Sequence, residues 1–515
     1  MQGETHIAPP GLDRRQGNRV ASFLSNIFKL TTGTVLAQVV GILLIPVVTR
    51  IYSPEYFGVA QLFLSIAAVL VVISSLSYHY VIMLPEKDED SMNVSVLCIV
   101  CILGTSAAAG AVFIGFSDWL GTVFETPMIA DYLIWLPVFI TFNSLFVILN
   151  RWLSRKARYG VLSKGIVVNS VSTRVFQIGG GLFIASPLGL ILSSVAGFAL
   201  ADLFMLFGTQ EDARHLKSVT VRRMRELAVR YREFASYGTA GNLANSMSWE
   251  LPAFMLAYFF NPTVLGNYAL AIMAVKLPMA MVGTAISQVF YQKASEEMNQ
   301  TGGVKTVVKE VHTRLIAVGI FPFIIFIILA EDLFTFVFGA NWLTAGTYAQ
   351  ILAPWLFAVF IVSPIATLFG VLEKQKTYSC FEVMTLCAWV AIFSVVGASG
   401  NPLLTLAIFS IGGMLIWGAK SVYLLRESGA GSRDSMLSLV RHLLLSIIIS
   451  LPLMLGVYVG LPLLLLFGIA GIAAVAYYLL IFFTDPLLRS ELIGMIQGSN
   501  PTKHTDWMER LGLFR

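Results

Sequence analysis

Long apolar runs alternate with short gaps along this chain of 515 residues, and its positive charges fall in every second gap. We count about fourteen runs of roughly 20 residues, of which the first two lie at 27–49 and 57–83. An apolar helix of that length crosses the hydrocarbon of a bilayer. Of the 34 Lys and Arg residues, 31 lie in the tails and in the alternate gaps that would face one side. Because short loops rich in Lys and Arg stay in the cytoplasm, the sequence predicts an all-α polytopic membrane protein with both termini cytoplasmic.

Composition excludes several classes of function. The chain is 57% hydrophobic and only 12% charged, whereas soluble domains carry about 25% charged residues. Its net charge of +5 is spread over short loops, so it does not indicate nucleic-acid binding. The four cysteines and six histidines lack the spacing of a metal site, and no nucleotide-binding motif is present. We therefore expect no metal, no cofactor and no catalytic site.

The spans and the charges together predict six segments. They are a cytoplasmic N-terminal tail at 1–26, an N-lobe of spans 1–6 at 27–208, a basic cytoplasmic linker at 209–233, a C-lobe of spans 7–12 at 234–425, spans 13 and 14 with their preceding loop at 426–484, and a cytoplasmic C-terminal tail at 485–515. The last two spans form one long apolar stretch, which we break at Gly460-Leu461-Pro462.

An internal repeat supports the division into two lobes. Residues 52–62 read YSPEYFGVAQL and residues 260–270 read FNPTVLGNYAL, so Pro54 and Gly58 match Pro262 and Gly266. The copies lie six spans apart, and an even number of spans gives them the same orientation. This pattern predicts a parallel repeat related by an axis along the membrane normal.

Several segments resemble the bacterial polysaccharide transporters, the Wzx-type oligosaccharide flippases of the multidrug/oligosaccharidyl-lipid/polysaccharide (MOP) exporter superfamily. They are TGTVLAQVVGILLIPVVTRIYSPEYFG at 32–58, VIMLPEKDED at 81–90, RWLSRKARYGVLSKG at 151–165, VGTAISQVFYQKASEE at 282–297 and GVLEKQKTY at 370–378. The resemblance implies two six-helix bundles around a central cleft in the inner membrane, with spans 13 and 14 as a helix pair outside the bundles.

Four of the charged residues within or at the edge of predicted spans stand out as candidates, because a charge there costs at least about 2.5–3.5 kcal/mol. Arg174 in span 5 and Lys276 in span 8 are candidates for a phosphate contact or for a structural role. Glu250 in span 7 would either pair with one of these cations or serve as a coupling site. Arg50 would be an interfacial anchor, while the family resemblance implies a basic residue at the outer mouth of the cleft.

The resemblance implies a flippase for undecaprenyl-pyrophosphate-linked oligosaccharides in lipopolysaccharide O-antigen or exopolysaccharide biosynthesis. Its partners would be the lipid-linked oligosaccharide, membrane lipids, and polysaccharide polymerase and chain-length proteins. A MATE-like exporter of small organic molecules is the alternative, but two basic residues against one acid within the spans argue against a cavity for cations. An enzyme of polysaccharide assembly is a third hypothesis, which the short outside loops disfavour.

Overall fold

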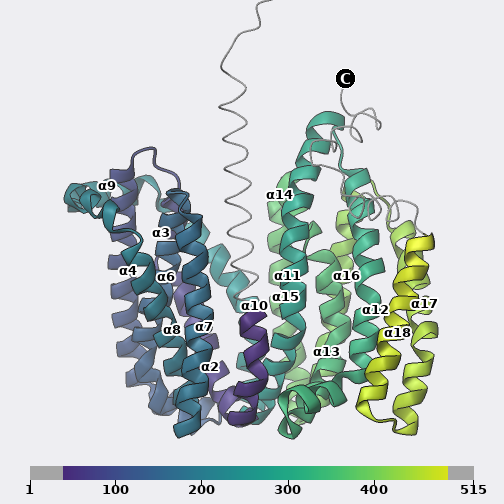
Figure 1. Ribbon diagram of the computed structural model, residues 1–515. Coiled ribbons are helices and arrows are strands. Elements are labelled where there is room, and N and C mark those ends of the chain that lie inside the picture. The colour runs from purple at the N-terminus through teal and green to yellow at the C-terminus, as the bar shows by residue number, and fades with distance from the viewer. Residues whose placement is uncertain (1–38, 485–515) are drawn as a thin grey trace, which may run out of the picture. The chain divides into compact units, whose positions relative to one another are not determined.

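The computed structural model describes residues 39–484, and all the regular structure in this range is helical (Figure 1). A helix lies in each of the fourteen predicted spans, and ten of these helices are long and apolar enough to cross a membrane. The fourteen are Val39–Ile51, α2 (Pro54–Ser74), α4 (Asp88–Gly115), α6 (Leu136–Arg155), α7 (Tyr159–Phe183), α8 (Pro187–Phe207), α10 (Thr239–Phe259), α11 (Pro262–Thr301), α12 (Lys305–Phe338), α13 (Leu343–Val362), α15 (Gln375–Val396), α16 (Pro402–Glu427), α17 (Ser432–Val459) and α18 (Leu463–Thr484).

Short elements connect these helices. They are α3 (Tyr78–Val81), α5 (Ser117–Val123), α9 (Val221–Arg230), α14 (Leu368–Val371), a π-helical turn at Phe234–Gly238, and 3-10 turns at Pro127–Trp135, Gln210–Ser218, Ala340–Trp342, Ile365–Thr367 and Gly397–Ser399. The predicted tails 1–26 and 485–515, and the first part of span 27–49, lie outside the described residues.

The described chain forms two compact units. The first comprises 39–282, 333–354 and 373–416, and the second comprises 283–332, 355–372 and 417–484. Helices α11 and α12 each pass from one unit into the other. The lobe boundaries drawn from the spans remain predictions.

The two copies of the repeat begin their helices in the same way. Ser53 accepts a hydrogen bond from the Tyr56 N–H at the start of α2, and Asn261 accepts one from the Val264 N–H at the start of α11. A proline follows each cap, at a position where its missing N–H leaves no bond unmade. The matched sequences therefore form matched helix N-termini.

These two N-termini cross each other at their glycines. A Cβ added to Gly58 would lie 1.7 Å from the Pro262 carbonyl oxygen, and one added to Gly266 would lie 1.8 Å from the Pro54 carbonyl oxygen. Each glycine thus faces the backbone of the other copy, and no larger residue fits at either position. Pro54 and Pro262 consequently lie together at one end of the first unit, as the parallel repeat predicted.

Helix α2 ends earlier than the predicted span 57–83. It stops at Ser74, and Leu76 and Ser77 then adopt left-handed backbone conformations with φ of 48° and 56° before α3 begins. Local and distant contacts both hold this turn: the Ser75 hydroxyl bonds to His79 Nδ1 across it, and the Ser77 hydroxyl accepts hydrogen bonds from Thr239 and Asn242 of α10. The predicted single span is therefore a long helix, a break and a short helix.

The basic linker forms an amphipathic helix that docks on the first unit. Helix α9 lies across the end of α4 (Figure 1). Leu227 is buried in the apolar cluster beneath it, while Arg223 donates two hydrogen bonds of 2.7 Å to Asp90. Arg222 and Arg225 remain exposed on the opposite face. A buried leucine and a bidentate ion pair are thus among the contacts that hold the linker.

The C-terminal helix pair packs within the second unit. Gly460, with φ of 76°, ends α17 and permits the turn into α18, so the predicted break at Gly460-Leu461-Pro462 is confirmed. Tyr477 of α18 donates a hydrogen bond of 2.8 Å to the Ala317 carbonyl of α12 and stacks on Phe321. The pair is therefore attached to α12 by both apolar and polar contacts.

The glycine crossing generates a prediction about stability. Gly58→Ala and Gly266→Ala should each lower the thermal stability of the purified protein by at least about 1–3 kcal/mol, because the obstructing atoms belong to backbone that cannot rotate away. The control is Gly104→Ala in α4, where an added Cβ meets nothing within 4 Å. Equal unfolding temperatures for all three variants would contradict the close crossing.

Candidate functional site

Arg50 fastens the first described helix to the end of α12. Its guanidinium donates hydrogen bonds of 2.9 Å to the Phe336 carbonyl and 2.7 Å to the Val337 carbonyl. Carbonyls in the last turn of a helix have no partner within the helix, and a cation at that end also suits the helix dipole. Next to it, the Trp342 indole donates to the Thr49 carbonyl at 2.8 Å. Arg50 therefore makes a structural contact that the sequence did not indicate.

Arg174 is a half-buried cation on α7 whose hydrogen-bond partner is neutral. Its Nη1 donates a hydrogen bond of 2.6 Å to the Gln177 side-chain oxygen, and the Gln177 carbonyl accepts a bond from the Tyr52 hydroxyl. No carboxylate acts on this guanidinium in the part of the chain that the structure describes. The positive charge of Arg174 is thus held in place by an amide and remains uncompensated.

Lys276 on α11 lies over an indole ring. Its Nζ is 4.0 Å from the centre of the Trp249 ring of α10, in the geometry of a cation–π contact. Glu250 lies near enough to attract Lys276 electrostatically, although the two form no ion pair among the described residues. The sequence offered Lys276 or Arg174 as partners for Glu250, and the structure brings Lys276 to it.

Glu250 is held from the other side by α2. Its carboxylate accepts a hydrogen bond from the fully buried Ser65 hydroxyl, which itself accepts one of 3.1 Å from the Gln61 amide. Three helices thus contribute to one polar cluster, made of Gln61, Ser65, Trp249, Glu250 and Lys276. Arg50 and Arg174 instead make the separate contacts described above.

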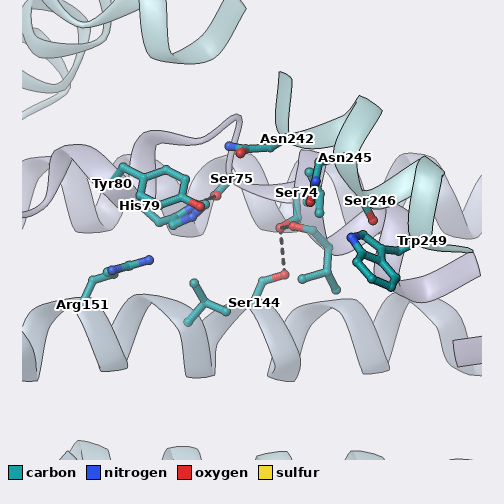
Figure 2. A pocket seen from close by; sticks show the side chains of 13 residues that line it. Ser74, Ser75, His79, Tyr80, Ser144, Arg151, Asn242, Asn245, Ser246 and Trp249 are labelled. Carbon is teal, nitrogen blue, oxygen red and sulfur yellow. Dashed lines mark hydrogen bonds between the residues drawn. The ribbon is translucent and has the colours of Figure 1, made fainter. Parts of the chain in front are cut away.

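A cavity of about 450 Å³ lies beside this cluster, between α2, α3, α6 and α10 (Figure 2). Trp249 belongs to both, since its indole lines the cavity and makes the cation–π contact with Lys276. The lining residues are Val71, Val72, Ser74, Ser75, His79, Tyr80, Ser144, Val147, Arg151, Asn242, Asn245, Ser246 and Trp249. They include one arginine and no Asp or Glu, so the cavity favours an anionic or neutral polar ligand.

Hydrogen bonds join two pairs of the residues that line the cavity. The Ser74 and Ser144 hydroxyls lie 2.8 Å apart, and the Ser75 hydroxyl lies 2.7 Å from His79 Nδ1 (Figure 2). The guanidinium of Arg151 stacks at 4.9 Å from the centre of the Tyr80 ring. That aromatic contact orients Arg151 and leaves its N–H groups available to a ligand.

This cavity was not predicted from the sequence, although one signal was present. Asn242, Asn245, Ser246 and Trp249 stand three, four and seven positions apart in a predicted span, and such residues share one face of a helix. A polar stripe on an apolar helix indicates a wet surface. The charge pattern placed Arg151 in a loop, but it belongs to the last turns of α6.

A family model described as polysaccharide biosynthesis protein matches residues 47–346. The chain belongs to this family. The match covers more than half of the sequence and includes the glycine crossing, the polar cluster and the cavity. No curated protein is similar enough in sequence to be counted as a relative. The resemblance to polysaccharide transporters is confirmed at the level of the family.

Two solved structures share the fold. The inward closed conformation of the lipid II flippase MurJ has a TM-score of 0.67 and 14% identity, covering 88% of this chain and 99% of that one. A MOP superfamily transporter from Pyrococcus furiosus has a TM-score of 0.50 and 14% identity, covering 79% and 96%. This polysaccharide biosynthesis protein is therefore a multi-pass membrane protein with the fold of a flippase or exporter, and its structural neighbours are transporters and not enzymes.

Metal chemistry receives no support from the arrangement of side chains. Within residues 39–484, no group of three or more His, Cys, Asp or Glu side chains is placed to hold a metal ion. The polar cluster and the cavity offer electrostatic attraction, hydrogen bonding and aromatic contacts.

The polar cluster generates a prediction about Lys276. Lys276→Met should lower thermal stability by roughly 1–3 kcal/mol, because it leaves the Glu250 carboxylate in the membrane without an opposite charge. Adding Glu250→Gln should restore most of that loss. Lys293→Met, at an exposed position on the same helix, is the control. A stable Lys276→Met variant that Glu250→Gln does not improve would show that the two charges are independent.

Proposed function

We propose that this protein flips undecaprenyl-pyrophosphate-linked oligosaccharides across the bacterial inner membrane, from the cytoplasmic to the periplasmic face. The observation that carries the proposal is the uncompensated guanidinium of Arg174, within a helix of a polysaccharide biosynthesis protein. A charge in a membrane helix is costly unless it serves a ligand or a partner. Here its partner is an amide, so an anionic headgroup would supply the missing charge.

Pyrophosphate suits the cations of the first unit. A guanidinium offers planar donors that match two phosphate oxygens at once, and an ammonium acts as a mobile point charge. Arg174 would provide the first kind of contact and Lys276 the second. Glu250 offsets part of the charge on Lys276, so we assign the stronger attraction to Arg174. The cavity adds Arg151 and no acid, which argues against an exporter of organic cations.

The charge pattern and the fold support the remaining parts of the proposal. Lys and Arg residues in alternate loops favour cytoplasmic positions for both termini. The prenyl chain would remain in lipid while the headgroup crosses by alternating access. The product would enter O-antigen or exopolysaccharide assembly, where polymerase and chain-length proteins are the proposed partners.

Transport should depend on Arg174 and Lys276 together. In a strain that relies on this protein, Arg174→Ala should reduce surface polysaccharide, and lipid-linked intermediates should accumulate on the cytoplasmic face. Loss of one charge-assisted contact costs about 1.5–3 kcal/mol, which corresponds to a rate roughly ten- to a hundredfold lower. Arg174→Lys should restore transport only in part, because Lys cannot supply the planar fork.

The amount of protein in the membrane separates this role from a structural one. A transport defect with normal protein levels supports contact with the substrate. For Lys276, the test is made in the Glu250→Gln background, where the loss of stability is offset: a transport defect that persists there supports contact with the substrate, and full recovery of transport indicates a structural role alone. Normal export by a stable Arg174→Ala, Lys276→Ala double variant would exclude the phosphate role for both residues.

A further inference from the structure

The break after α2 stores backbone strain at the wall of the cavity. Leu76 and Ser77 are adjacent non-glycine residues with φ of 48° and 56°. Such residues cost on the order of 1–3 kcal/mol each, and they persist only where the surroundings hold them in place. Ser74, Ser75, His79 and Tyr80 flank the break, and all four line the cavity.

Contacts on α10 hold the break in this conformation. The fully buried Ser77 hydroxyl lies 3.1 Å from the Thr239 hydroxyl and accepts a hydrogen bond of 3.2 Å from the Asn242 amide. The π-helical turn at Phe234–Gly238 immediately precedes these residues. Irregular turns of this kind within helices are frequent at functional sites. The two unusual backbone segments are therefore neighbours, since Thr239, the residue after the π-helical turn, contacts Ser77 in the break.

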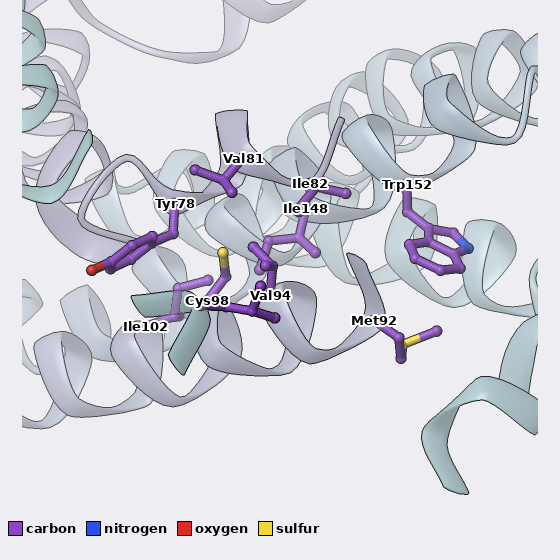
Figure 3. Close-up of a cluster of buried hydrophobic side chains, with 10 residues drawn as sticks. Tyr78, Val81, Ile82, Met92, Val94, Cys98, Ile102, Ile148 and Trp152 are labelled. Atoms are coloured by element: carbon purple, nitrogen blue, oxygen red, sulfur yellow. The ribbon is translucent and has the colours of Figure 1, made fainter. Parts of the chain in front are cut away.

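The break sorts the side chains of α3 onto two sides. Tyr78 and Val81 enter an apolar cluster with Cys98, Ile148 and others (Figure 3). His79 and Tyr80 face the cavity instead (Figure 2). An uninterrupted α2 would lack this arrangement, because the left-handed turn redirects the chain. The strain is thus coupled to the presentation of His79 and Tyr80.

The chemistry of the cavity matches a phosphorylated sugar. Arg151 supplies a cation for phosphate, and no carboxylate among the lining residues opposes it. Asn242, Asn245 and Ser246 offer amide and hydroxyl groups suited to sugar hydroxyls, while Trp249 offers a flat apolar face. A volume of about 450 Å³ lies in the range of about 300–1,000 Å³ for small-ligand sites. It suits one glycosyl phosphate better than a whole oligosaccharide.

We propose that this cavity is a loading site that binds the phosphate-bearing first sugar of the substrate before the headgroup reaches Lys276. The inference rests on the proposed function and adds a second position along the path. Trp249 connects the two positions, since its ring lines the cavity and the centre of that ring lies 4.0 Å from the Lys276 Nζ. A sugar that leaves the cavity along Trp249 therefore meets the Lys276 ammonium next.

Binding of a soluble probe tests the loading site directly. The full-length protein in lipid nanodiscs is titrated with N-acetylglucosamine 1-phosphate by calorimetry, with N-acetylglucosamine and inorganic phosphate as comparison ligands. We expect saturable binding of the sugar phosphate, tighter than binding of either comparison ligand. Arg151→Gln should weaken it by about tenfold or more, the loss expected for one charge-assisted contact. Arg222→Gln, at an exposed cation on α9, should leave it unchanged.

A second variant separates loss of binding from loss of folding. The Asn245 side chain makes no hydrogen bond within the described chain, so Asn245→Ala should fold normally. This substitution should lower the affinity for the sugar phosphate and leave the affinity for inorganic phosphate unchanged. Equal affinity for sugar phosphate and inorganic phosphate would overturn the proposal, as would undiminished binding by Arg151→Gln.

The two proposals can fail separately. If export requires Arg174 but the sugar phosphate does not bind, the loading site is wrong and the flippase is supported. If the sugar phosphate binds as expected but no lipid-linked oligosaccharide is transported, the cavity is a sugar-phosphate site and the flippase is wrong.

Discussion

The close crossing of α2 and α11 sets the positions of the groups that matter most in the first unit. At Gly58 and Gly266 each helix rests on the backbone of the other, and from that point both helices run into the unit. Ser65 follows seven residues after Gly58, and Lys276 ten residues after Gly266. At about 1.5 Å per residue, these two residues lie roughly 10 and 15 Å along their helices from the crossing. The hydroxyl that holds Glu250 and the ammonium that attracts it are therefore placed from one fixed point.

Lys276 and Arg174 differ in how their positive charges are compensated. Lys276 is satisfied within the protein by the Trp249 ring and by Glu250, so its charge has a structural counterpart. Arg174 is oriented by Gln177, and within the described chain its charge is not neutralised by a carboxylate. The second arrangement is the more costly one in a membrane. It is also the one that leaves the strongest attraction for a phosphate, which is why the proposed function depends on Arg174.

The sequence predicted those features of the fold that depend on residues close together in the chain. The spans, the break at Gly460 and the matched helix starts at Ser53 and Asn261 depend on neighbouring residues, and they were predicted or are explained by sequence. The contact of Arg50 with α12 and the break at Ser77 depend on partners more than 150 residues away. Such partners become visible only when helices are packed. The cavity was missed for the same reason, because α2, α6 and α10 each supply only part of it.

Transport in a purified system tests the flippase proposal most directly. The protein would be reconstituted into liposomes that contain a fluorescent sugar on a polyprenyl diphosphate, and the fluorophore that reaches the outer leaflet would be reduced by a membrane-impermeant reagent. We expect the protein to accelerate the appearance of the labelled sugar at that leaflet. We also expect the same sugar on a neutral polyprenyl carrier without phosphate to move far more slowly. Equal rates for the charged and the neutral lipid, or no transfer above that of empty liposomes, would contradict the proposal.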